Sequence, residues 1–509
     1  MAELINRVRR SFYRDSVALM RISASISALA GVGTAALMIG STANKKLMRD
    51  AGLLNADGDS AGANDLIIAV RADDDGSAVE AANKAEALLD DAGADAGKTS
   101  EWEPKTLETA LQQLSGANLA LISVPGEFAA AEARRAINNG LHVLLFSDNV
   151  PIADEIELKK EARRRGLLMM GPDCGTAIIA GVPLAFANVV PSGSIGIVAA
   201  SGTGLQEVST LLARSGVGIS HAIGVGGRDL HQAVGGITTL MAIDALDRNP
   251  STRHIVLISK PPEPTIAKLI LERVGKSAKT FTICFLGLGE LELPANAGFA
   301  ADLRSAAEHA LSSQKIQWPI RLPDPAALAL RIGPARSKVQ GLFCGGTLCA
   351  EAQVFFRRAG LPAESNVPIP GVDRAGAGAR EDAHVLLDLG EDEYTIGRPH
   401  PMIDPTLRNR MVADALSDGR TAVILLDVVI GYGANRNPAG ELIAWLPPAA
   451  ARKCLLIASI CGTESDPQCY SRQMQQLDDA GIVVAPSNAH AAELAISVVR
   501  SVKGGAPRA

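Results

Sequence analysis

The chain has 509 residues, enough for three or four domains, and its 47% hydrophobic but only 3% aromatic residues favour parallel-sheet α/β domains over β-sandwiches. A net charge of −6 without a long basic run argues against nucleic acid or an anionic membrane as a partner. No uninterrupted apolar run predicts a transmembrane helix. Seven cysteines without a CxxC pair predict reduced thiols in a cytoplasmic protein, and no His or Cys spacing predicts a metal site.

The first region, residues 1–100, alternates strand and helix patterns. Strands are predicted at 16–20, 34–39 and 65–70, and helices at 43–50 and 76–92. This order favours a compact α+β domain of ferredoxin-like type. A GxGxxA-like run at 31–36 precedes an apolar strand and does not follow one, so the interpretation as a dinucleotide-binding motif fails.

Three further regions follow, and each is predicted to form an α/β domain. Residues 101–190 contain short apolar strands that end in turn residues, as in the βαβ steps of a doubly wound sheet. Residues 191–330 form the next region, and a linker at 331–337 separates it from the last region, 338–505. The last two regions both open with strand, glycine/threonine loop and helix, which hints at a duplicated topology.

The most informative loop follows the apolar strand 194–200. It reads Ser201-Gly202-Thr203-Gly204 and leads directly into a helical pattern, and the next strand ends in a second glycine loop that contains Gly226 and Gly227. Glycine lets the backbone approach an anion closely, and a helix N-terminus offers N–H donors with a positive dipole end. A single loop of this kind is more often a plain βα turn.

Similar loops recur at other strand ends of the last region. Candidate ligand-binding residues in these loops are Gly346, Thr347, Gly433, Gly462 and Thr463. The combination predicts a small anion or a phosphate-bearing ligand. Asp466, after the last of these loops, is a candidate ligand or helix cap, and the cap is the more common role.

The segment 391–404 mixes acids, prolines, an arginine and a histidine on a predicted loop. Arg398 could bind a carboxylate or phosphate bidentately, and His400 could act as acid or base near neutral pH, so both are candidate catalytic residues. The alternative is a rigid loop in which Arg398 pairs with Glu391 or Glu393. The sequence leaves both interpretations open.

A resemblance to known families rests on several runs. The runs 171–175, 193–198, 201–203 and 224–227 resemble the α subunit of succinyl-CoA synthetase, and nearly the whole chain resembles the FdrA family of acyl-CoA-synthetase-like proteins. The resemblance implies an α/β fold with several doubly wound parallel-sheet domains behind the N-terminal α+β domain. Residues 101–190 would be a truncated CoA-binding-like Rossmann domain, and 191–330 and 338–505 would be flavodoxin-type domains.

One departure from the ligases bears on function. The ligases carry a phosphorylated histidine in a Gly-His-Ala-Gly segment, and Asn296 occupies the matching position here. An amide cannot carry a phosphoryl group as imidazole does, so a phosphohistidine mechanism is not expected.

The FdrA resemblance implies a subunit of an oxamate-type carbamoyltransferase, which uses carbamoyl phosphate as substrate, has no tightly bound cofactor and works with a second protein subunit in an oligomer. Two alternatives stay open. One is an acyl-CoA synthetase that uses CoA and a nucleotide. The other is a non-catalytic assembly subunit.

Overall fold

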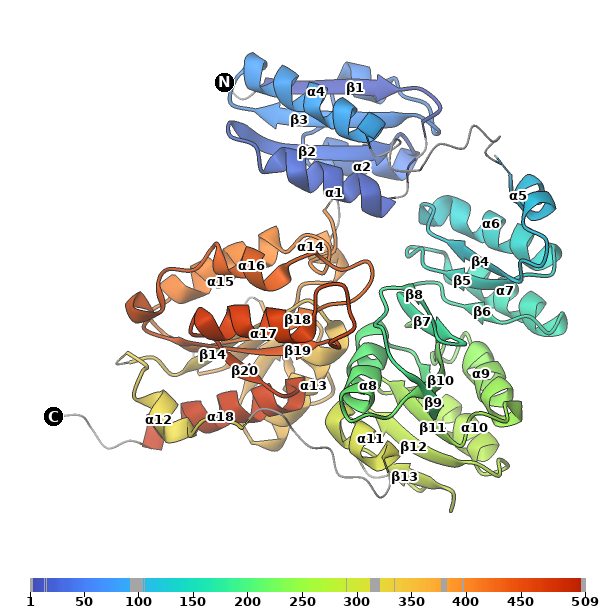
Figure 1. Cartoon of the computed structure of the whole chain (residues 1–509), viewed down its shortest axis with the longest axis vertical. Coiled ribbons are helices and arrows are strands. Elements are labelled where there is room, and N and C mark those ends of the chain that lie inside the picture. The colour runs from blue at the N-terminus through green and yellow to red at the C-terminus, as the bar shows by residue number, and fades with distance from the viewer. Residues whose placement is uncertain are drawn as a thin grey trace. The chain divides into compact units, whose positions relative to one another are not determined.

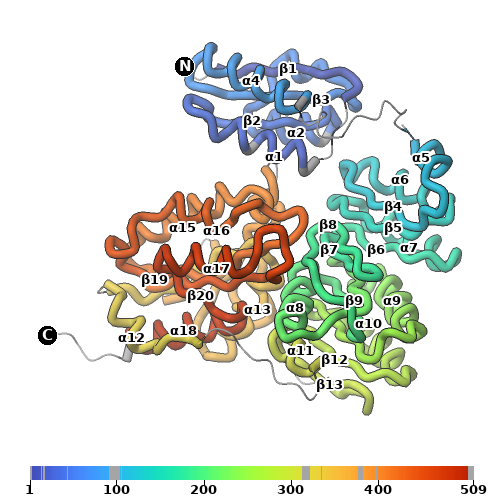
Figure 2. Tube along the Cα trace, viewed as in Figure 1, coloured from blue at the N-terminus to red at the C-terminus, as the bar shows by residue number. Residues whose placement is uncertain are grey.

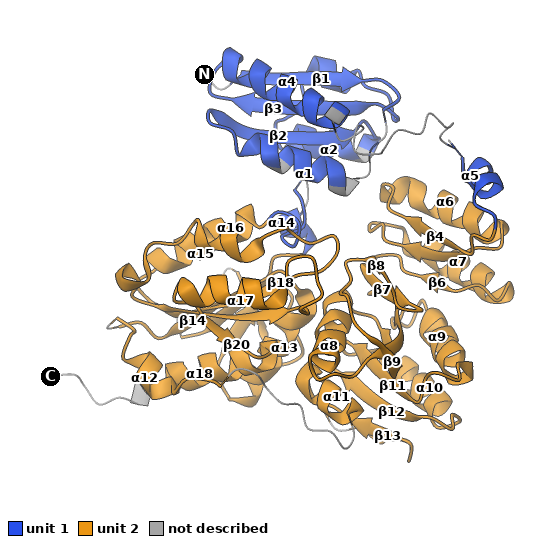
Figure 3. Cartoon of the chain, viewed as in Figure 1, with its two compact units in different colours: residues 1–115, 391–404 blue, residues 116–390, 405–509 orange. Residues whose placement is uncertain are grey.

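The computed structural model describes residues 3–12, 14, 16–91, 104, 106–289, 291–311, 321–333, 335–376, 382–395 and 398–504. The chain divides into two compact units (Figure 3): residues 1–115 with 391–404, and residues 116–390 with 405–509. Segment 391–404 therefore groups with the N-terminal unit, although the sequence assigned it to the region 338–505. No helix among the described residues has the length and apolarity needed to cross a membrane.

The N-terminal unit is built on an antiparallel sheet in the order β1-β3-β2 (Figure 1). Its elements up to residue 91 are β1 (Glu3–Arg9), α1 (Ser16–Ser27), β2 (Val32–Ile39), α2 (Thr42–Asp50), α3 (Ala56–Asp59), β3 (Leu66–Ala72) and α4 (Asp75–Asp91). Helices α5 (Leu107–Gln113) and α14 (Asp392–Thr395) also belong to this unit. The α+β character that the sequence predicted is confirmed, and both strand pairs of the sheet are antiparallel.

The predicted strand at 16–20 is wrong, because these residues begin helix α1. Leu19, Ile22 and Ile26 recur at helical spacing and are buried in the core of this unit, which a short apolar window could not distinguish from a strand. Strand β1 was not predicted.

The second unit contains three sheets, and the smallest is parallel, in the order β4-β5-β6. Its strands are β4 (Leu119–Ile122), β5 (His142–Leu145) and β6 (Met169–Met170), with helices α6 (Gly126–Asn138) and α7 (Ile152–Arg164). A buried ionic cluster ties α7 to the next sheet: Lys159 Nζ lies 2.7 Å from Asp229 Oδ1, 2.9 Å from Glu155 Oε1 and 3.0 Å from the Val225 carbonyl oxygen.

The α8 lobe, residues 176–311, is built on a seven-stranded sheet in the order β13-β12-β11-β9-β10-β7-β8. Its strands are β7 (Thr176–Ile179), β8 (Val182–Ala185), β9 (Ser192–Ala199), β10 (Ile219–Gly224), β11 (His254–Ser259), β12 (Thr280–Phe285) and β13 (Ala297–Phe299). Its helices are α8 (Gly202–Arg214), α9 (Ile237–Arg248), α10 (Pro264–Val274) and α11 (Leu303–Ala310). Strands β9 to β13 are parallel.

The α13 lobe, residues 321–390 and 405–504, has a second seven-stranded sheet in the order β16-β15-β17-β14-β18-β19-β20. Its strands are β14 (Lys338–Phe343), β15 (Ala363–Ser365), β16 (Asp373–Arg374), β17 (His384–Asp388), β18 (Thr421–Val429), β19 (Leu455–Cys461) and β20 (Val483–Ala485). Its helical elements are α12 (Pro325–Ala329), α13 (Gly346–Arg358), α15 (Thr406–Ser417), α16 (Pro438–Ile443), the short turn η1 (Ala449–Ala451), α17 (Tyr470–Asp479) and α18 (Asn488–Gly504).

The two lobes share a strand order. The α8 lobe contains the run β10-β9-β11-β12-β13, and the α13 lobe contains the run β17-β14-β18-β19-β20. In each run the strand that comes first in the chain stands second, and the later strands follow outward from it. This is the flavodoxin-like order, and in each lobe the first strand leads into the helix after which we name the lobe. Figure 2 shows the two traces packed against each other, with α8 and α13 at the junction.

Candidate functional site

Helix α8 begins at the carboxyl end of strand β9. Ser201 is the N-cap, with extended backbone, and its hydroxyl oxygen accepts a hydrogen bond from the Gly204 N–H at 2.9 Å. A Cβ atom on Gly202 would lie 3.1 Å from Thr176 Oγ1, so this turn is tightly packed. No described residue accepts a hydrogen bond from the N–H groups of Gly202 and Thr203, which therefore remain donors at the positive end of the helix.

Helix α13 begins in the same way at the carboxyl end of β14, but a carboxylate is built into its loop. The Cys344 and Gly345 N–H groups each donate to Asp427 at 2.7 Å. Burial raises the pKa of Asp427, while Arg408, whose Nη1 lies 3.9 Å from Asp427 Oδ1, offsets part of that rise. Asp427 thus fixes the loop through Cys344 and Gly345. The N–H groups of the first helical residues, from Gly346 onward, are not bonded to Asp427.

The two helix starts meet directly. Ser201 Oγ hydrogen-bonds Thr347 Oγ1, and a Cβ atom on Gly345 would lie 2.9 Å from Thr203 Cγ2. The positive ends of two helices thus lie side by side, and the Asp427 carboxylate screens part of the charge at the α13 end. We call this place, defined by residues 201–204 and 345–347, the cradle. The structure thus brings together Ser201, Gly202, Thr203, Gly204, Gly346 and Thr347 from the predicted binding residues.

Lys260 adds a positive charge to this edge, and the sequence analysis missed it. It follows β11, whose Ile258 is in register with Ala199 of β9, so Lys260 lies at the sheet edge where Ser201 begins α8. The positive charge of Lys260 also acts on helix α13. Burial raises the pKa of Cys349 in this helix, and the charge of Lys260 opposes that rise. No described carboxylate forms an ion pair with Lys260. A lone cation directly after a buried apolar strand is the signal that could have found it.

Acidic groups also border the cradle. A Cβ atom on Gly346 would collide with Asp388 Oδ2, so a larger residue there would require the Asp388 side chain to move. Asp388 ends β17, and its Oδ1 accepts the Gly390 N–H at 3.0 Å. N–H donors, a lysine and a carboxylate therefore gather around the cradle, which suits a ligand that carries both an anionic group and N–H donors.

Behind the cradle, the lobes exchange equivalent contacts. Glu207 and Glu351 occupy the sixth position of α8 and α13, respectively. Glu207 Oε1 accepts the Asn488 N–H at 3.1 Å, where α18 begins, and Glu351 Oε1 accepts the Leu303 N–H at 2.7 Å, where α11 begins. Each lobe thus caps the last helix of the other with a buried glutamate.

Two arginines repeat the same exchange. Arg214 Nη2 donates to the Pro486 carbonyl oxygen at 3.1 Å, and Arg358 Nη2 donates to the Ala301 carbonyl oxygen at 3.0 Å, each two residues before the helix that the glutamate caps. Both arginines are the thirteenth residue of their helix. These paired contacts and the shared strand order relate the two lobes by an approximate two-fold symmetry. The cradle is formed by the equivalent helix starts of the two lobes.

The glycine loop with Gly226 and Gly227 does not join the cradle. A Cβ atom on Gly226 would collide with the Pro172 carbonyl oxygen, and one on Gly227 would lie 3.5 Å from Asp173 Oδ2. The loop packs on the turn 171–174, and its glycines are explained by that close approach and by the φ of +87° at Gly226.

The loops of Gly433 and of Gly462 with Thr463 serve the junction between the lobes. A Cβ atom on Gly433 would lie 2.7 Å from Phe186 Cδ1. Thr463 Oγ1 donates to the Val189 carbonyl oxygen at 2.8 Å, and the Asp466 carboxylate accepts the N–H groups of Thr463 and Val189 at 2.7 and 2.8 Å. The Asp466 carboxylate therefore fills the position in the Gly462–Thr463 loop where an anion was expected, and the Phe186 ring packs against Gly433.

Arg398 and His400 belong to the N-terminal unit, whereas all residues of the cradle belong to the second unit. His400 Nδ1 accepts the Met402 N–H at 3.2 Å, and burial lowers the pKa of His400 to about 4. The imidazole is thus neutral at pH 7. The catalytic role of both residues stays a prediction.

Asn296 lies at the opposite edge of the sheet from the cradle. It precedes β13, whose Ala297 is in register with Phe281 near the amino end of β12, whereas Ser201 follows the carboxyl end of β9. Its side-chain amide nitrogen lies within 2.9–3.0 Å of the carbonyl oxygens of Val274, Ser277 and Lys279. Asn296 therefore has a structural role, and residues 286–296 contain no histidine.

Comparisons with known proteins agree with this architecture. Residues 342–498 match the CoA-ligase family, and residues 1–105 match a family described as AllF, heavy metal-associated domain. The first match falls on the α13 lobe, for which the sequence analysis predicted only a flavodoxin-type domain. All seven cysteines lie between residues 174 and 469, so the region 1–105 contains no thiol ligand for a metal.

Similarity to a ligase subunit covers a smaller part of the chain. The α subunit of the ADP-forming succinate–CoA ligase of Aquifex aeolicus (strain VF5) is 30% identical over 180 residues, which is 34% of this chain and 57% of that subunit. A structure of ATP citrate lyase from Methanothrix soehngenii is 18% identical, with a TM-score of 0.35 over 44% of this chain and 45% of the lyase chain.

The fold and the site define an α/β protein of the CoA-ligase class, which suggests an enzyme, with an antiparallel α+β domain of AllF type at its N-terminal end. The chain belongs to the family of the uncharacterized protein YahF of Escherichia coli (strain K12). The two are 38% identical over 501 residues, which covers 96% of this chain and 97% of YahF.

Proposed function

We propose that the chain is an FdrA-like subunit of an oxamate-type carbamoyltransferase and that carbamoyl phosphate binds in the cradle. The observation that carries the proposal is the contact between Ser201 and Thr347, which joins two helix N-termini. A phosphate dianion between them accepts backbone N–H bonds, and Lys260 supplies a counter-charge. Asp388, beside Gly346, accepts from the carbamoyl NH₂ group.

The proposed reaction needs no phosphoenzyme. The acceptor nitrogen attacks the carbamoyl carbon, a C–N bond forms, and the C–O bond to phosphate breaks with its electron pair leaving on phosphate. The proton lost by the acceptor nitrogen passes to the released phosphate. N–H donors already aimed at the phosphate stabilise the negative charge that develops on it during bond cleavage.

The direct test is phosphate release from carbamoyl phosphate and oxamate by the chain together with its partner subunit. We expect Lys260→Met to lower the rate at least tenfold, as loss of a hydrogen bond to a charged group predicts. Lys268→Met, on the exposed face of α10, is the matched control and should change nothing. Gly202→Val should also reduce the rate of phosphate release, because the added side chain occupies space in the turn that begins α8. Full activity of both cradle variants would refute the proposal.

The chain alone should show little turnover, because the cradle has no nucleophile and base paired for acyl transfer. Adding the partner subunit should restore activity. Unaided turnover by the chain would show a self-contained site. Phosphate release by the partner without this chain would favour the alternative of a non-catalytic assembly subunit.

The second candidate is an acyl-CoA synthetase that uses CoA and a nucleotide, which the CoA-ligase match of residues 342–498 favours. The position of Asn296 and the lack of a histidine in 286–296 count against a phosphohistidine route. Incubation with γ-labelled ATP should leave no acid-labile, base-stable label. Stoichiometric labelling of a histidine would restore the ligase interpretation.

A further inference from the structure

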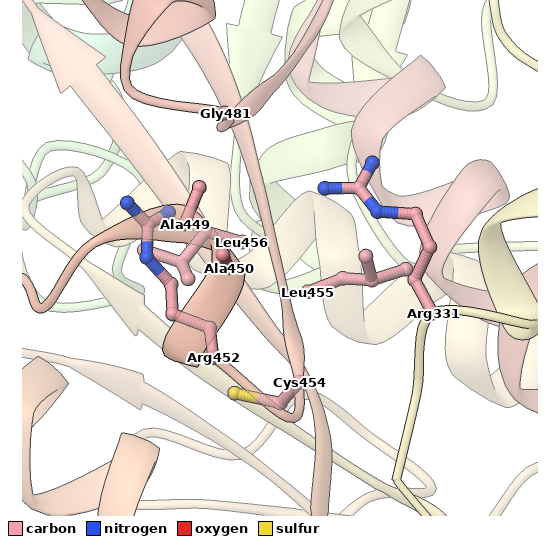
Figure 4. A pocket seen from close by; sticks show the side chains of 8 residues that line it. All are labelled: Arg331, Ala449, Ala450, Arg452, Cys454, Leu455, Leu456 and Gly481. Atoms are coloured by element: carbon pink, nitrogen blue, oxygen red, sulfur yellow. The ribbon is translucent and has the colours of Figure 1, made fainter.

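A polar cavity lies at the amino end of β19, on the edge of the α13 sheet opposite the cradle. It measures about 210 Å³, whereas roughly 10–15 Å³ on the same measure holds one water molecule. Its walls come from Arg331 after α12, from the turn η1 with Arg452, and from Cys454 and Leu455 where β19 begins. Figure 4 shows the two arginine side chains on either side of Leu455, with their guanidinium groups directed the same way.

The two arginines have different supports. Arg452 is held by the backbone: its Nε donates to the Pro447 carbonyl oxygen at 3.0 Å and its Nη2 to the Ala480 carbonyl oxygen at 2.7 Å. Arg331 is exposed, and its segment is fixed by the Gly333 N–H, which donates to the Lys453 carbonyl oxygen at 2.9 Å. Neither guanidinium forms an ion pair with a described carboxylate.

The cavity therefore contains unneutralised positive charge. Burial lowers the pKa of Arg452, and the charge of Arg331 lowers it further. Burial raises the pKa of the Cys454 thiol, which stays protonated and can donate. The polar side chains of the cavity thus offer hydrogens and no carboxylate oxygen, so the matching ligand supplies oxygen acceptors and negative charge.

We propose that this cavity, which we call the β19 pocket, binds a small oxyanion, either a phosphate or a carboxylate, between Arg331 and Arg452. Its volume lies below the roughly 300–1,000 Å³ of pockets for drug-sized ligands, so a small acid or inorganic phosphate fits better than a nucleotide. The site is separate from the cradle and does not depend on the proposed function.

The test measures binding of inorganic phosphate and of oxalate by calorimetry in a full-length Gly202→Val chain, whose cradle is obstructed. We expect binding to persist in this background and to weaken about tenfold or more when Arg452→Gln is added. Arg331→Gln, at an exposed side chain, should also weaken binding and is the variant least disturbing to the fold. Arg410→Gln, an exposed arginine on α15, is the matched control.

Alkylation of Cys454, located by peptide mass spectrometry, reports on the pocket itself. A ligand present at ten times its Kd should slow alkylation about tenfold, and this protection should disappear in the Arg331→Gln chain. Protection by phosphate alone or by oxalate alone identifies which oxyanion the pocket prefers. If neither anion binds in the Gly202→Val background, or if protection is unchanged by both arginine substitutions, the proposal is wrong.

Discussion

The buried Glu351 should make the stability of the junction between the lobes depend on pH. Burial first, then the charges of Asp302 and Glu207, raise the pKa of Glu351 from 4.5 to about 8 in the folded protein. The folded chain therefore keeps a proton that the unfolded chain loses above pH 4.5. The contribution of Glu351 to the free energy of unfolding is therefore fully present below pH 4.5 and is lost as the pH rises toward 8.

The size of this effect follows from the shift. Each pKa unit corresponds to about 1.4 kcal/mol, so the full shift is worth on the order of 5 kcal/mol. Glu351→Gln mimics the protonated side chain and should remove the dependence. The free energy of unfolding of Glu351→Gln, relative to that of the native protein, should therefore increase by about 1.4 kcal/mol for each pH unit between 4.5 and about 8.

Urea unfolding of both proteins at several pH values between these limits measures the difference directly. Glu272→Gln, an exposed residue on α10, is the control and should follow the native protein. Hydrogen exchange at the Leu303 N–H, which donates to Glu351, localises the effect to the junction. If the stability difference between Glu351→Gln and the native protein stays constant over this pH range, Glu351 does not carry the proposed proton.

Three other outcomes are expected. Lys159→Met should destabilise the chain by about 3–5 kcal/mol in chemical unfolding, because it leaves the buried Asp229 charge without its cation, whereas the exposed Lys160→Met should have little effect. Asn296→Ala should cost roughly 1–3 kcal/mol, yet leave phosphate binding intact in calorimetry. The His400 imidazole should stay neutral by NMR from neutral pH down toward its pKa of about 4. Because protonation is disfavoured in the fold, this group contributes stability that is lost as the pH falls from about 6.5 toward that value.

The sequence predicted the loops that follow parallel strands better than the contacts those loops make. Strand and helix periodicities located β9, α8, β14 and α13, because buried parallel strands are long apolar runs and glycine marks the turn after them. The assignment of ligands to every such loop was too broad. The Ile430 side chain lies where a side chain at position 462 would be, and the Phe186 ring lies where one at position 433 would be. These contacts depend on the tertiary structure, so no local sequence pattern shows them.

The cradle is assembled from segments that lie far apart along the chain. Lys260 and Thr347 reach the site of Ser201 from segments 59 and 146 residues away, and no local pattern encodes that meeting. The start of helix α1 was mistaken for a strand because four consecutive apolar residues, 17–20, fit both periods. The exchanged contacts of Glu207 and Glu351 likewise join segments that are distant along the chain, so no local pattern predicts them.

The approximate two-fold symmetry of the lobes has a consequence for assembly. Both halves of the cradle are carried by one polypeptide, so their meeting is an intramolecular event with a fixed effective concentration, and dilution cannot separate them by mass action. For the same reason, each chain always contains one copy of residues 201–204 and one copy of residues 345–347. Any dependence of activity on protein concentration would then report on the association of this chain with other chains, and not on the formation of the cradle.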